Sequence, residues 1–97
     1  MTDDLFDRSV QAPEHVLVRE LDGESVLLNL DSETYFGLDE VGTRFWALLT
    51  GAPSVQAAYD LLLAEYDVSP EQLHQDMARL LGQLLDHGLL ELTNGPV

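Results

Sequence analysis

Apolar and polar residues alternate through the first third of the chain, and apolar residues then recur at helical spacing almost to its end. Alternation with a period of two is typical of strands, and it predicts three of them, over residues 14–21, 24–30 and 34–38. The pair Asp22-Gly23 joins the first two as a hairpin, because glycine accepts the positive φ that a type I′ turn demands. The pattern therefore predicts a small antiparallel sheet.

The third predicted strand is short and aromatic, and it follows a polar turn at residues 31–33. Within this strand Phe36 and Leu38 share one face, while Tyr35 projects from the other. Large aromatic residues usually belong to the core, and we assign Phe36 to it. Tyr35 is predicted to be exposed on an edge strand, which makes it a candidate for recognising a partner.

Three amphipathic helices are predicted after the strands. The first has Asp39 as its N-cap and ends near Thr50. The second begins after the N-cap Ser54, and the third begins after Ser69 and ends at Gly88. Their apolar positions recur at helical spacing, and they are Val41, Phe45, Leu48 and Leu49, then Val55, Ala58, Tyr59, Leu62, Leu63 and Tyr66, then Leu73, Met77, Leu80, Leu81, Leu84 and Leu85.

The start of the third helix has the clearest sequence signal. Ser69 is the N-cap, Pro70 occupies the first helical position, and Gln72 is expected to complete a capping box. The element order is then three strands followed by three helices. This order predicts an α+β fold of the winged-helix-like type, a three-stranded antiparallel sheet that the helices cover.

The domain boundaries follow from the same pattern. Residues 1–13 lack periodicity and are predicted to be a flexible acidic N-terminal tail. Residues 14–92 form one domain, and residues 93–97 form a C-terminal tail. Residues 89–92 are expected either to form a short closing strand or to remain an extended tail.

The charge of the chain is strongly one-sided. Its 97 residues include 18 acidic residues against 4 arginines and no lysine, and the formal net charge is −14. Proteins that bind nucleic acids gain most of their affinity from Lys and Arg on phosphates, so this charge argues against a nucleic-acid partner. Two interpretations stay open: the acidity only keeps the protein soluble, or it steers a basic partner.

The sequence contains no pattern that predicts catalysis, a cofactor, a metal or a membrane segment. Cysteine and the common nucleotide-binding and nucleophile motifs are absent, and His15, His74 and His87 lack the spacing of a metal site. No stretch reaches the roughly 18 apolar residues of a membrane helix. The first residues lack the basic and apolar regions of a secretory signal. We therefore expect a cytoplasmic protein that is not an enzyme.

The third predicted helix has more apolar surface than one contact requires. One row contains Leu73, Met77, Leu80 and Leu84, and a second contains Leu81 and Leu85. One row can face the other two helices. The other either lines a groove against the third strand or closes the core over the sheet, and the sequence leaves both possibilities open. A methionine in such a row suits an adaptable peptide-binding surface.

Most of the chain resembles the PqqD family of peptide-recognition proteins, also called RiPP precursor recognition elements. The resemblance covers residues 14–92 and is carried by the runs LNLDSETYFGLDEVGTRFWALLTG and SVQAAYDLLLAEYDVSPEQLHQDMARLLGQLLDHGLLEL. Its most specific parts are Tyr-Phe-Gly-Leu at 35–38, Gly42, Thr43 and Trp46, Glu-Tyr-Asp-Val-Ser at 65–69, Asp76, and Gly-Leu-Leu at 88–90.

The resemblance implies a domain that binds the leader segment of a ribosomally made precursor peptide. The leader would add as an antiparallel strand to the third strand, beside the third helix, and the protein would deliver it to a processing enzyme without doing chemistry itself. The ladder would involve the backbone of Thr34, Tyr35, Phe36, Gly37 and Leu38, and the helix side would be lined by Leu73, Asp76, Met77, Leu80 and Leu84.

Residues 35–49 are similar to the freestanding recognition proteins of lasso peptide biosynthesis. The implied partners are a lasso precursor leader and a transglutaminase-like leader peptidase or a modifying enzyme. Asp39 stands where the family commonly has Asn, and both residues cap helices. The alternatives are a peptide chaperone of pyrroloquinoline quinone biosynthesis and a winged-helix transcription regulator, although the acidic third helix would read DNA poorly. Open edge strands also permit a homodimer.

Overall fold

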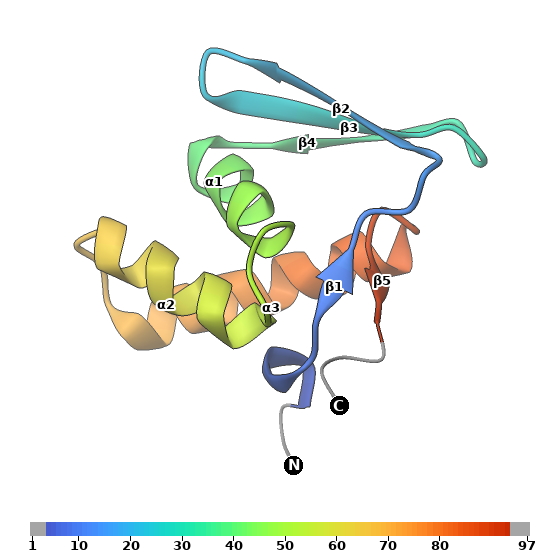
Figure 1. Cartoon of the computed structure of the whole chain (residues 1–97). Coiled ribbons are helices and arrows are strands. Elements are labelled where there is room, and N and C mark those ends of the chain that lie inside the picture. The colour runs from blue at the N-terminus through green and yellow to red at the C-terminus, as the bar shows by residue number, and fades with distance from the viewer. Residues whose placement is uncertain (1–3, 94–97) are drawn as a thin grey trace.

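The computed structural model describes residues 4–93. The main sheet forms one layer, and the three α-helices form a second layer on one side of it (Figure 1). This is the predicted α+β, winged-helix-like arrangement. The elements are η1 (Asp4–Asp7), β1 (Val10–Gln11), β2 (Val16–Leu21), β3 (Glu24–Asn29), β4 (Thr34–Leu38), α1 (Glu40–Leu49), α2 (Val55–Glu65), α3 (Pro70–Asp86) and β5 (Glu91–Leu92).

Strands β2, β3 and β4 pair antiparallel in sequence order. Asp22 and Gly23 have φ angles of 56° and 85°, which confirms the type I′ turn expected between the first two strands. The polar turn before β4 also forms, and its last residue, Glu33, donates its N–H to the main-chain oxygen of Asn29 at 2.7 Å. The two turns fix the register of the sheet.

The sheet turns one face toward the helices. Ser25, Leu27 and Asn29 of β3 are buried on this face, together with Leu38 of β4. Side chains that alternate with them project from the opposite face, as the period of a strand requires. Tyr35 lies on that opposite face and is 72% exposed, so its predicted orientation is confirmed.

Each helix begins at its predicted cap. The side-chain oxygens of Asp39, Ser54 and Ser69 accept hydrogen bonds from the N–H group three residues later, at 2.8, 3.1 and 3.4 Å. The second half of the predicted capping box is wrong, because Gln72 Nε2 donates to Asp76 Oδ1 at 3.0 Å. An amide one turn ahead on the same face can reach this carboxylate, so the Gln72 side chain runs along α3 instead of back to its cap.

Helix α3 ends at a left-handed glycine, as predicted. Gly88 has a φ of 71°, its N–H donates to the oxygen of Leu85 at 3.1 Å, and the N–H of Leu89 donates to the oxygen of Leu84 at 2.9 Å. These two bonds form a Schellman motif, which satisfies carbonyls that the helix itself leaves free. The motif turns the chain away from α3 and toward β5.

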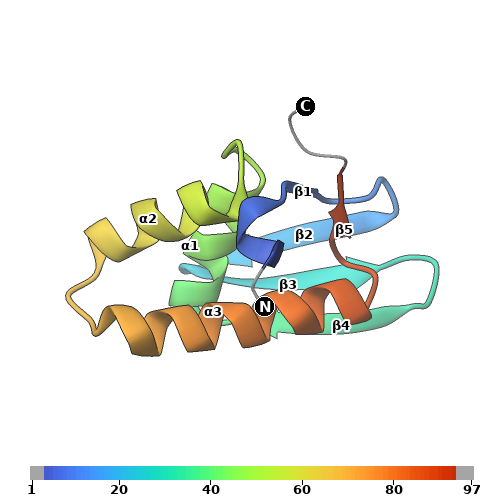
Figure 2. The ribbon, with the colours of Figure 1, turned by 90° about the horizontal axis from the view of Figure 1, so that it is seen from below.

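The hydrophobic core lies between the sheet and the helices. Helices α2 and α3 pack side by side, and α3 runs along the same side of the molecule as β4 (Figure 2). The buried apolar residues come from every layer, and they are Phe6, Val10, Leu27, Leu38, Phe45, Trp46, Leu49, Val55, Ala58, Tyr59, Leu62, Leu73, Met77, Leu81, Leu84, Leu89 and Leu90.

The predicted N-terminal tail is corrected by the structure over the residues described. Phe6 is only 4% exposed, and its ring stacks on His74 at 4.2 Å and meets Tyr59 edge to face at 5.8 Å. Val10 is also buried, and it pairs with Leu92 in a ladder between β1 and β5. This segment therefore packs against α2 and α3, and residues 89–92 include a closing strand. Residues 1–3 and 94–97 of the two predicted tails lie outside the described residues.

Candidate functional site

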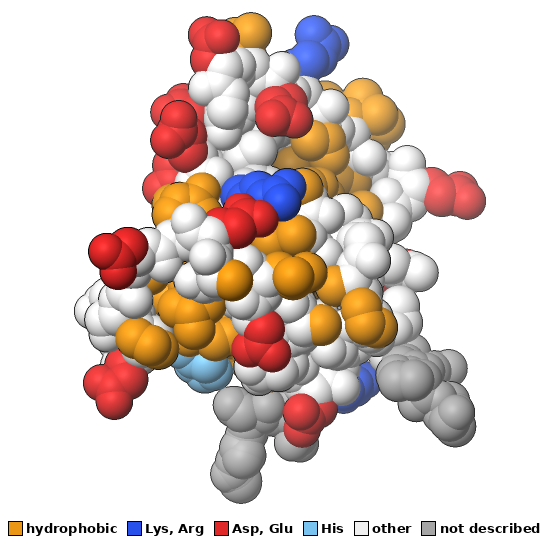
Figure 3. Space-filling model, turned by 60° about the vertical axis from the view of Figure 1, so that its left-hand side comes forward, with side chains coloured by type: hydrophobic (Ala, Val, Ile, Leu, Met, Phe, Trp, Pro, Cys, Tyr) orange, Lys and Arg blue, Asp and Glu red, His pale blue; other side chains and the backbone are white. Residues whose placement is uncertain are grey.

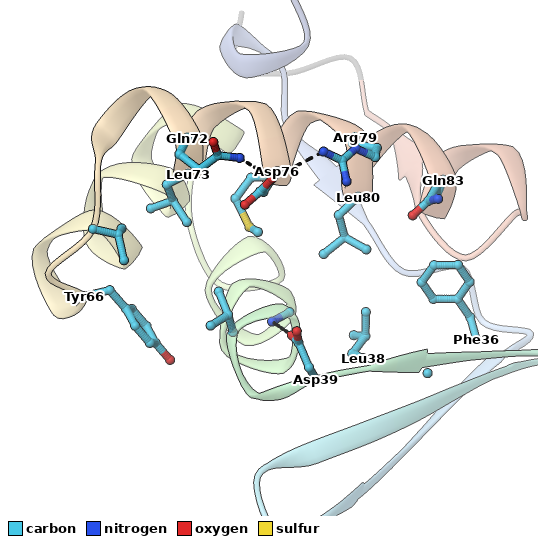
Figure 4. Close-up of a pocket in the computed structure, with 15 residues that line it drawn as sticks. Phe36, Leu38, Asp39, Tyr66, Gln72, Leu73, Asp76, Arg79, Leu80 and Gln83 are labelled. Atoms are coloured by element: carbon cyan, nitrogen blue, oxygen red, sulfur yellow. Dashed lines mark hydrogen bonds and ion pairs between the residues drawn. The ribbon is translucent and has the colours of Figure 1, made fainter.

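A groove runs between β4 and α3, and it has a volume of about 610 Å³. Figure 4 shows Phe36 and Leu38 rising from β4 toward Leu80 on α3, with Tyr66 at one end. The groove is lined by Phe36, Gly37, Leu38, Asp39, Val41, Gly42, Tyr66, Val68, Gln72, Leu73, Asp76, Met77, Arg79, Leu80 and Gln83.

The base of the groove is apolar. Leu38, Leu73 and Met77 line it although each is almost completely buried, so their exposed atoms face the groove. Phe36 and Leu80 are half-buried and stand higher on its two walls. An apolar ligand side chain that binds here removes both its own surface and the surface of the groove from contact with water. Burying a side chain of leucine size contributes about 1.5–3 kcal/mol.

The first turn of α1 forms part of the groove wall, and a glycine there leaves no side chain on the wall. A Cβ atom added to Gly42 would lie 3.3 Å from Asp39 Oδ1 and 3.3 Å from Leu38 Cδ2. Both of those neighbours line the groove, and the Asp39 carboxylate is held by the N–H of Gly42 at 2.8 Å. Glycine therefore permits the close approach between the end of β4 and the first turn of α1.

The rim along α3 is polar. Asp76 Oδ1 accepts hydrogen bonds from Gln72 Nε2 at 3.0 Å and from Arg79 Nη2 at 3.4 Å. Figure 4 shows these side chains along the α3 side of the groove, followed by Gln83. The side chains of Asp76 and Arg79 are well exposed, so both retain capacity to bind polar groups of a ligand.

The other wall of the groove is a strand with a free edge. Within residues 4–93, β4 pairs with β3 on one side and with no strand on the other. Every second residue of such an edge points its N–H and C=O groups away from the sheet. An extended peptide can bond to these groups and add itself as the next strand, which would place alternate side chains of that peptide in the groove.

Phe36, in the middle of β4, also contacts the residue that ends α3. The ring of Phe36 lies 5.4 Å from that of His87, the residue that caps the C-terminus of α3. His87 Nδ1 lies 2.8 Å from the main-chain oxygen of Gln83. This contact joins strand and helix at one end of the groove.

Seven of the ten residues predicted for the site line this groove. They are Phe36, Gly37, Leu38, Leu73, Asp76, Met77 and Leu80.

The other three predicted residues do not line it. Thr34 is exposed at the start of β4, and Tyr35 projects from the opposite face of the sheet. Leu84 is 0% exposed and belongs to the core, so its predicted place on the groove wall is wrong. Seven residues are slightly less than two helical turns, so Leu84 is rotated from the Met77 direction. Leu84 belongs to the buried core.

Eight residues that line the groove were not predicted from the sequence. Val41 and Tyr66 were assigned to helical stripes, and Val68 was named only within the run 65–69 that carries the family resemblance. The polar members of α3 did carry a signal, because Gln72, Asp76 and Gln83 recur at helical spacing on one face. The complete set that was missed is Asp39, Val41, Gly42, Tyr66, Val68, Gln72, Arg79 and Gln83.

Other kinds of site were sought in the same part of the chain. Among residues 4–93, no group of three or more His, Asp or Glu side chains is arranged to hold a metal ion. No helix within that range combines the length and the apolarity needed to cross a membrane. The groove therefore stays the leading candidate for function.

The sequence and the fold both have known relatives. Residues 24–90 match the family described as coenzyme PQQ synthesis protein D (PqqD). The structure of TbiB1 in complex with the TbiA(beta) leader peptide is 37% identical in sequence, with a TM-score of 0.74 over 84% of this chain and 94% of that one. A lasso peptide synthetase B1 complexed with the leader peptide has the same fold at 22% identity, with a TM-score of 0.72 over 86% of this chain and 98% of that one.

None of the curated proteins matches the sequence. The family match nevertheless spans well over half of the chain, and the first structure is clearly related in sequence along most of its length. The fold and the sequence thus lead to the same relatives. This protein belongs to the PqqD family.

Proposed function

We propose that this protein binds the leader segment of a ribosomally synthesised precursor peptide in lasso peptide biosynthesis. The observation that carries the proposal is the free edge of β4 beside an apolar groove. The similar TbiB1 structure, a complex with a leader peptide, supports it. The protein is not an enzyme in this proposal. It holds the leader in the cytoplasm and presents the precursor to a leader peptidase or a modifying enzyme.

The leader binds as an antiparallel strand next to β4. Its main chain bonds to the outward N–H and C=O groups of Thr34–Leu38, which provides affinity without reading side chains. Alternate leader side chains then enter the groove. Leu73, Met77 and Leu80 contact the apolar ones, and these contacts select the sequence.

The polar rim adds a second kind of selection. Asp76 and Arg79 offer opposite charges 3.4 Å apart on the exposed side of the groove. A polar or charged leader residue next to this pair forms a hydrogen bond with one of the two side chains. An apolar leader residue at the same position would remove water from the pair without replacing the lost hydrogen bonds. We therefore expect polar leader residues next to the rim of α3 and apolar leader residues in the base of the groove.

The strand geometry can be tested with backbone-modified leaders. A fluorescent leader from the precursor gene nearest to the gene of this protein is titrated with the protein, and anisotropy gives the Kd. N-methylation at successive leader positions removes one N–H at a time. Only every second N–H faces β4, so the affinity losses should alternate along the leader. Losses of similar size at successive positions would mean that the leader binds as a helix, because each N–H beyond the first turn of a helix is bonded within it.

The groove itself is tested with a matched pair of variants. Leu80 is half-buried on the groove wall, whereas Leu61 is exposed on α2 and lies outside the groove. Leu80→Glu should weaken leader binding by tenfold or more, because it places a charge where an apolar leader residue packs. Leu61→Glu should leave the Kd unchanged. Equal affinities for the two folded variants would refute the assignment of the leader to this groove.

A further inference from the structure

The face of the main sheet that points away from the helices is apolar. The register aligns Leu17, Leu28 and Tyr35 in one row across the three strands, and Val26 lies beside this row. Figure 1 shows the helices on the other side of the sheet only. We call this surface the outer face; its apolar residues are Leu17, Leu21, Val26, Leu28 and Tyr35.

These side chains are open to solvent. Leu17 is 52% exposed and Leu21 is 74% exposed, while Val26 is also exposed and Leu28 is half-buried. Leu17, Leu28 and Tyr35 are neighbours on three adjacent strands, and Val26 lies next to them, whereas Leu21 lies opposite Glu24 and beyond Arg19 on the same face. Contiguous apolar patches on a protein surface mark places where another macromolecule binds, and tyrosine is enriched at such places.

The charges around the outer face decide what kind of partner fits it. Asp22 and Glu24 lie at the turn at one end of the strands, and Asp31 and Glu33 lie at the turn at the other end. Arg19 is the one basic residue on strands β2, β3 and β4, and it lies on the outer face itself, opposite Val26. Acidic side chains also outnumber basic ones over the neighbouring surface shown in Figure 3.

This charge disfavours a second copy of the chain as the occupant. Two copies meeting face to face would bring the acidic ends of both sheets together, and each copy has a formal charge of −14. Like charges placed opposite one another at an interface oppose association. A partner with an apolar centre and Lys or Arg around it would instead satisfy both the apolar rows and the acidic ends.

The outer face also borders the groove. Tyr35 is the second residue of β4 and pairs with Leu28, so its side chain is on the outer face while its main chain belongs to the edge beside the groove. A peptide strand added to β4 would extend the sheet past Tyr35, and every second side chain of that peptide would project from the outer face. A protein bound to the outer face would therefore lie against the bound peptide.

We propose that the outer face is the docking surface for the enzyme that processes the bound leader, and that the enzyme meets it with an apolar patch surrounded by basic residues. The proposal rests on the function proposed above. It assigns the edge and the outer face of one small sheet to two different partners. The edge of β4 holds the peptide, and the outer face holds the enzyme next to it.

The probe for this surface is the purified leader peptidase encoded nearest to the gene of this protein. Its Kd is measured by biolayer interferometry against the full chain with leader bound. Leu17→Asp places a charge in the apolar row, and Leu61→Asp is the matched control because Leu61 is similarly exposed, at 50%, on α2. Leu17→Asp should weaken peptidase binding by tenfold or more, and Leu61→Asp should not change it.

Salt dependence tests the charge of the partner. Peptidase binding should weaken several-fold as NaCl is raised from about 50 to about 300 mM, because exposed opposite charges are screened. The double variant Asp31→Asn and Glu33→Gln should reduce this dependence. Leader anisotropy is measured on every variant, and it should stay unchanged in Leu17→Asp.

The outcomes separate the two proposals. If the unaltered protein fails to bind its leader, the proposed function fails. If it binds the leader but not the peptidase, or if Leu17→Asp binds the peptidase normally, the outer face is not the docking surface. Sedimentation velocity tests whether a second copy of the chain binds the outer face instead. A dimer that Leu17→Asp converts to a monomer, with peptidase binding intact, would overturn the proposal in favour of a second copy.

Discussion

The side-chain amide of Asn29 donates to the main-chain oxygen of His87 at 2.9 Å, and this bond joins the end of β3 to the end of α3. The same side chain accepts hydrogen bonds from the N–H groups of Asp31 and Ser32, at 3.0 and 3.3 Å. One buried residue therefore orders the turn before β4 and holds the helix against the sheet. Because β4 and α3 are the two walls of the groove, Asn29 fixes how far apart they stand.

Asn29→Ala should destabilise the fold by about 2 kcal/mol, because it removes three part-buried hydrogen bonds made by one buried side chain. Urea unfolding followed by circular dichroism measures this change. Ser32→Ala is the control, since the hydroxyl of Ser32 bonds only at the surface, to Thr34, and such changes stay within about 0.5 kcal/mol. Similar stabilities for the two variants would mean that the Asn29 bonds are dispensable.

Two glycines of the C-terminal half should respond in opposite ways to the same substitution. Gly88 has a φ of 71°, and a Cβ there would lie 3.0 Å from Asn29 Nδ2, so Gly88→Ala should cost about 1–2 kcal/mol. Gly82 lies within α3 with nothing within 4 Å of an added Cβ, so Gly82→Ala should stabilise by about 0.5–1 kcal/mol. Thermal unfolding of both proteins compares the signs. A stabilised Gly88→Ala would contradict the role given to the left-handed conformation.

A buried pair of hydroxyl groups joins the sheet to α1. Ser25 Oγ and Thr43 Oγ1 lie 2.8 Å apart, and both side chains are buried. Thr43→Val should cost about 1–3 kcal/mol, because Ser25 then keeps a buried hydroxyl without its partner. Adding Ser25→Ala should restore part of the loss, so the double variant should be more stable than the sum of the single changes predicts. Strict additivity in urea unfolding would show that the two hydroxyls act independently.

The ion pair between α1 and α2 should make stability depend on pH in the acidic range. Arg44 Nε and Nη2 donate to the two carboxylate oxygens of Glu65 at 2.8 and 2.7 Å, and these bonds lower the pKa of Glu65. A lowered folded-state pKa contributes stability above the unfolded-state pKa, and this stability is lost as the pH falls through the folded-state value.

Glu65→Gln should therefore be less stable than the unaltered protein near pH 7, and the two should converge as the pH falls below about 4, where the unfolded-state carboxyl titrates. Urea midpoints at a series of pH values measure the difference. Glu20→Gln on β2 is the control for removing an exposed charge. Because the pair is exposed to solvent, the difference should also shrink in high salt. A gap that persists at low pH would exclude the ion pair as its source.

The local parts of the fold could be predicted from sequence because their causes are local. Alternation set β2, β3 and β4, the Asp22-Gly23 pair set the turn between the first two, and cap residues set the start of every helix. The segment around Phe6 could not be predicted in this way. Its two-residue strand has no period, and Val10 finds its partner at Leu92, more than eighty residues away.

The groove was predictable to the extent that it depends on strand and helix faces. Phe36, Leu38 and Met77 were placed correctly because alternation and helical spacing determine which side chains point together. Spacing alone does not determine how far α3 is rotated about its axis, so Leu84 was assigned to the wall although packing buries it. Tyr66 was assigned to the apolar stripe of the second helix, but α2 ends at Glu65, and Tyr66 lines the groove from an extended backbone that the helical period does not describe.

The short ladder between β1 and β5 gives the chain an almost circular course. Val10 pairs with Leu92 and Gln11 with Glu91, so the polypeptide returns to where it started, and neither strand lines the groove. For this fold, the place where the chain is opened therefore matters less than the order in which the elements follow one another around this closed course. New ends opened at the Asp22-Gly23 turn, with the old ones linked, would yield a circular permutant that keeps both walls of the groove intact. For the same reason the unit can be tethered to a catalytic domain through β1 or β5 while its groove faces an incoming peptide.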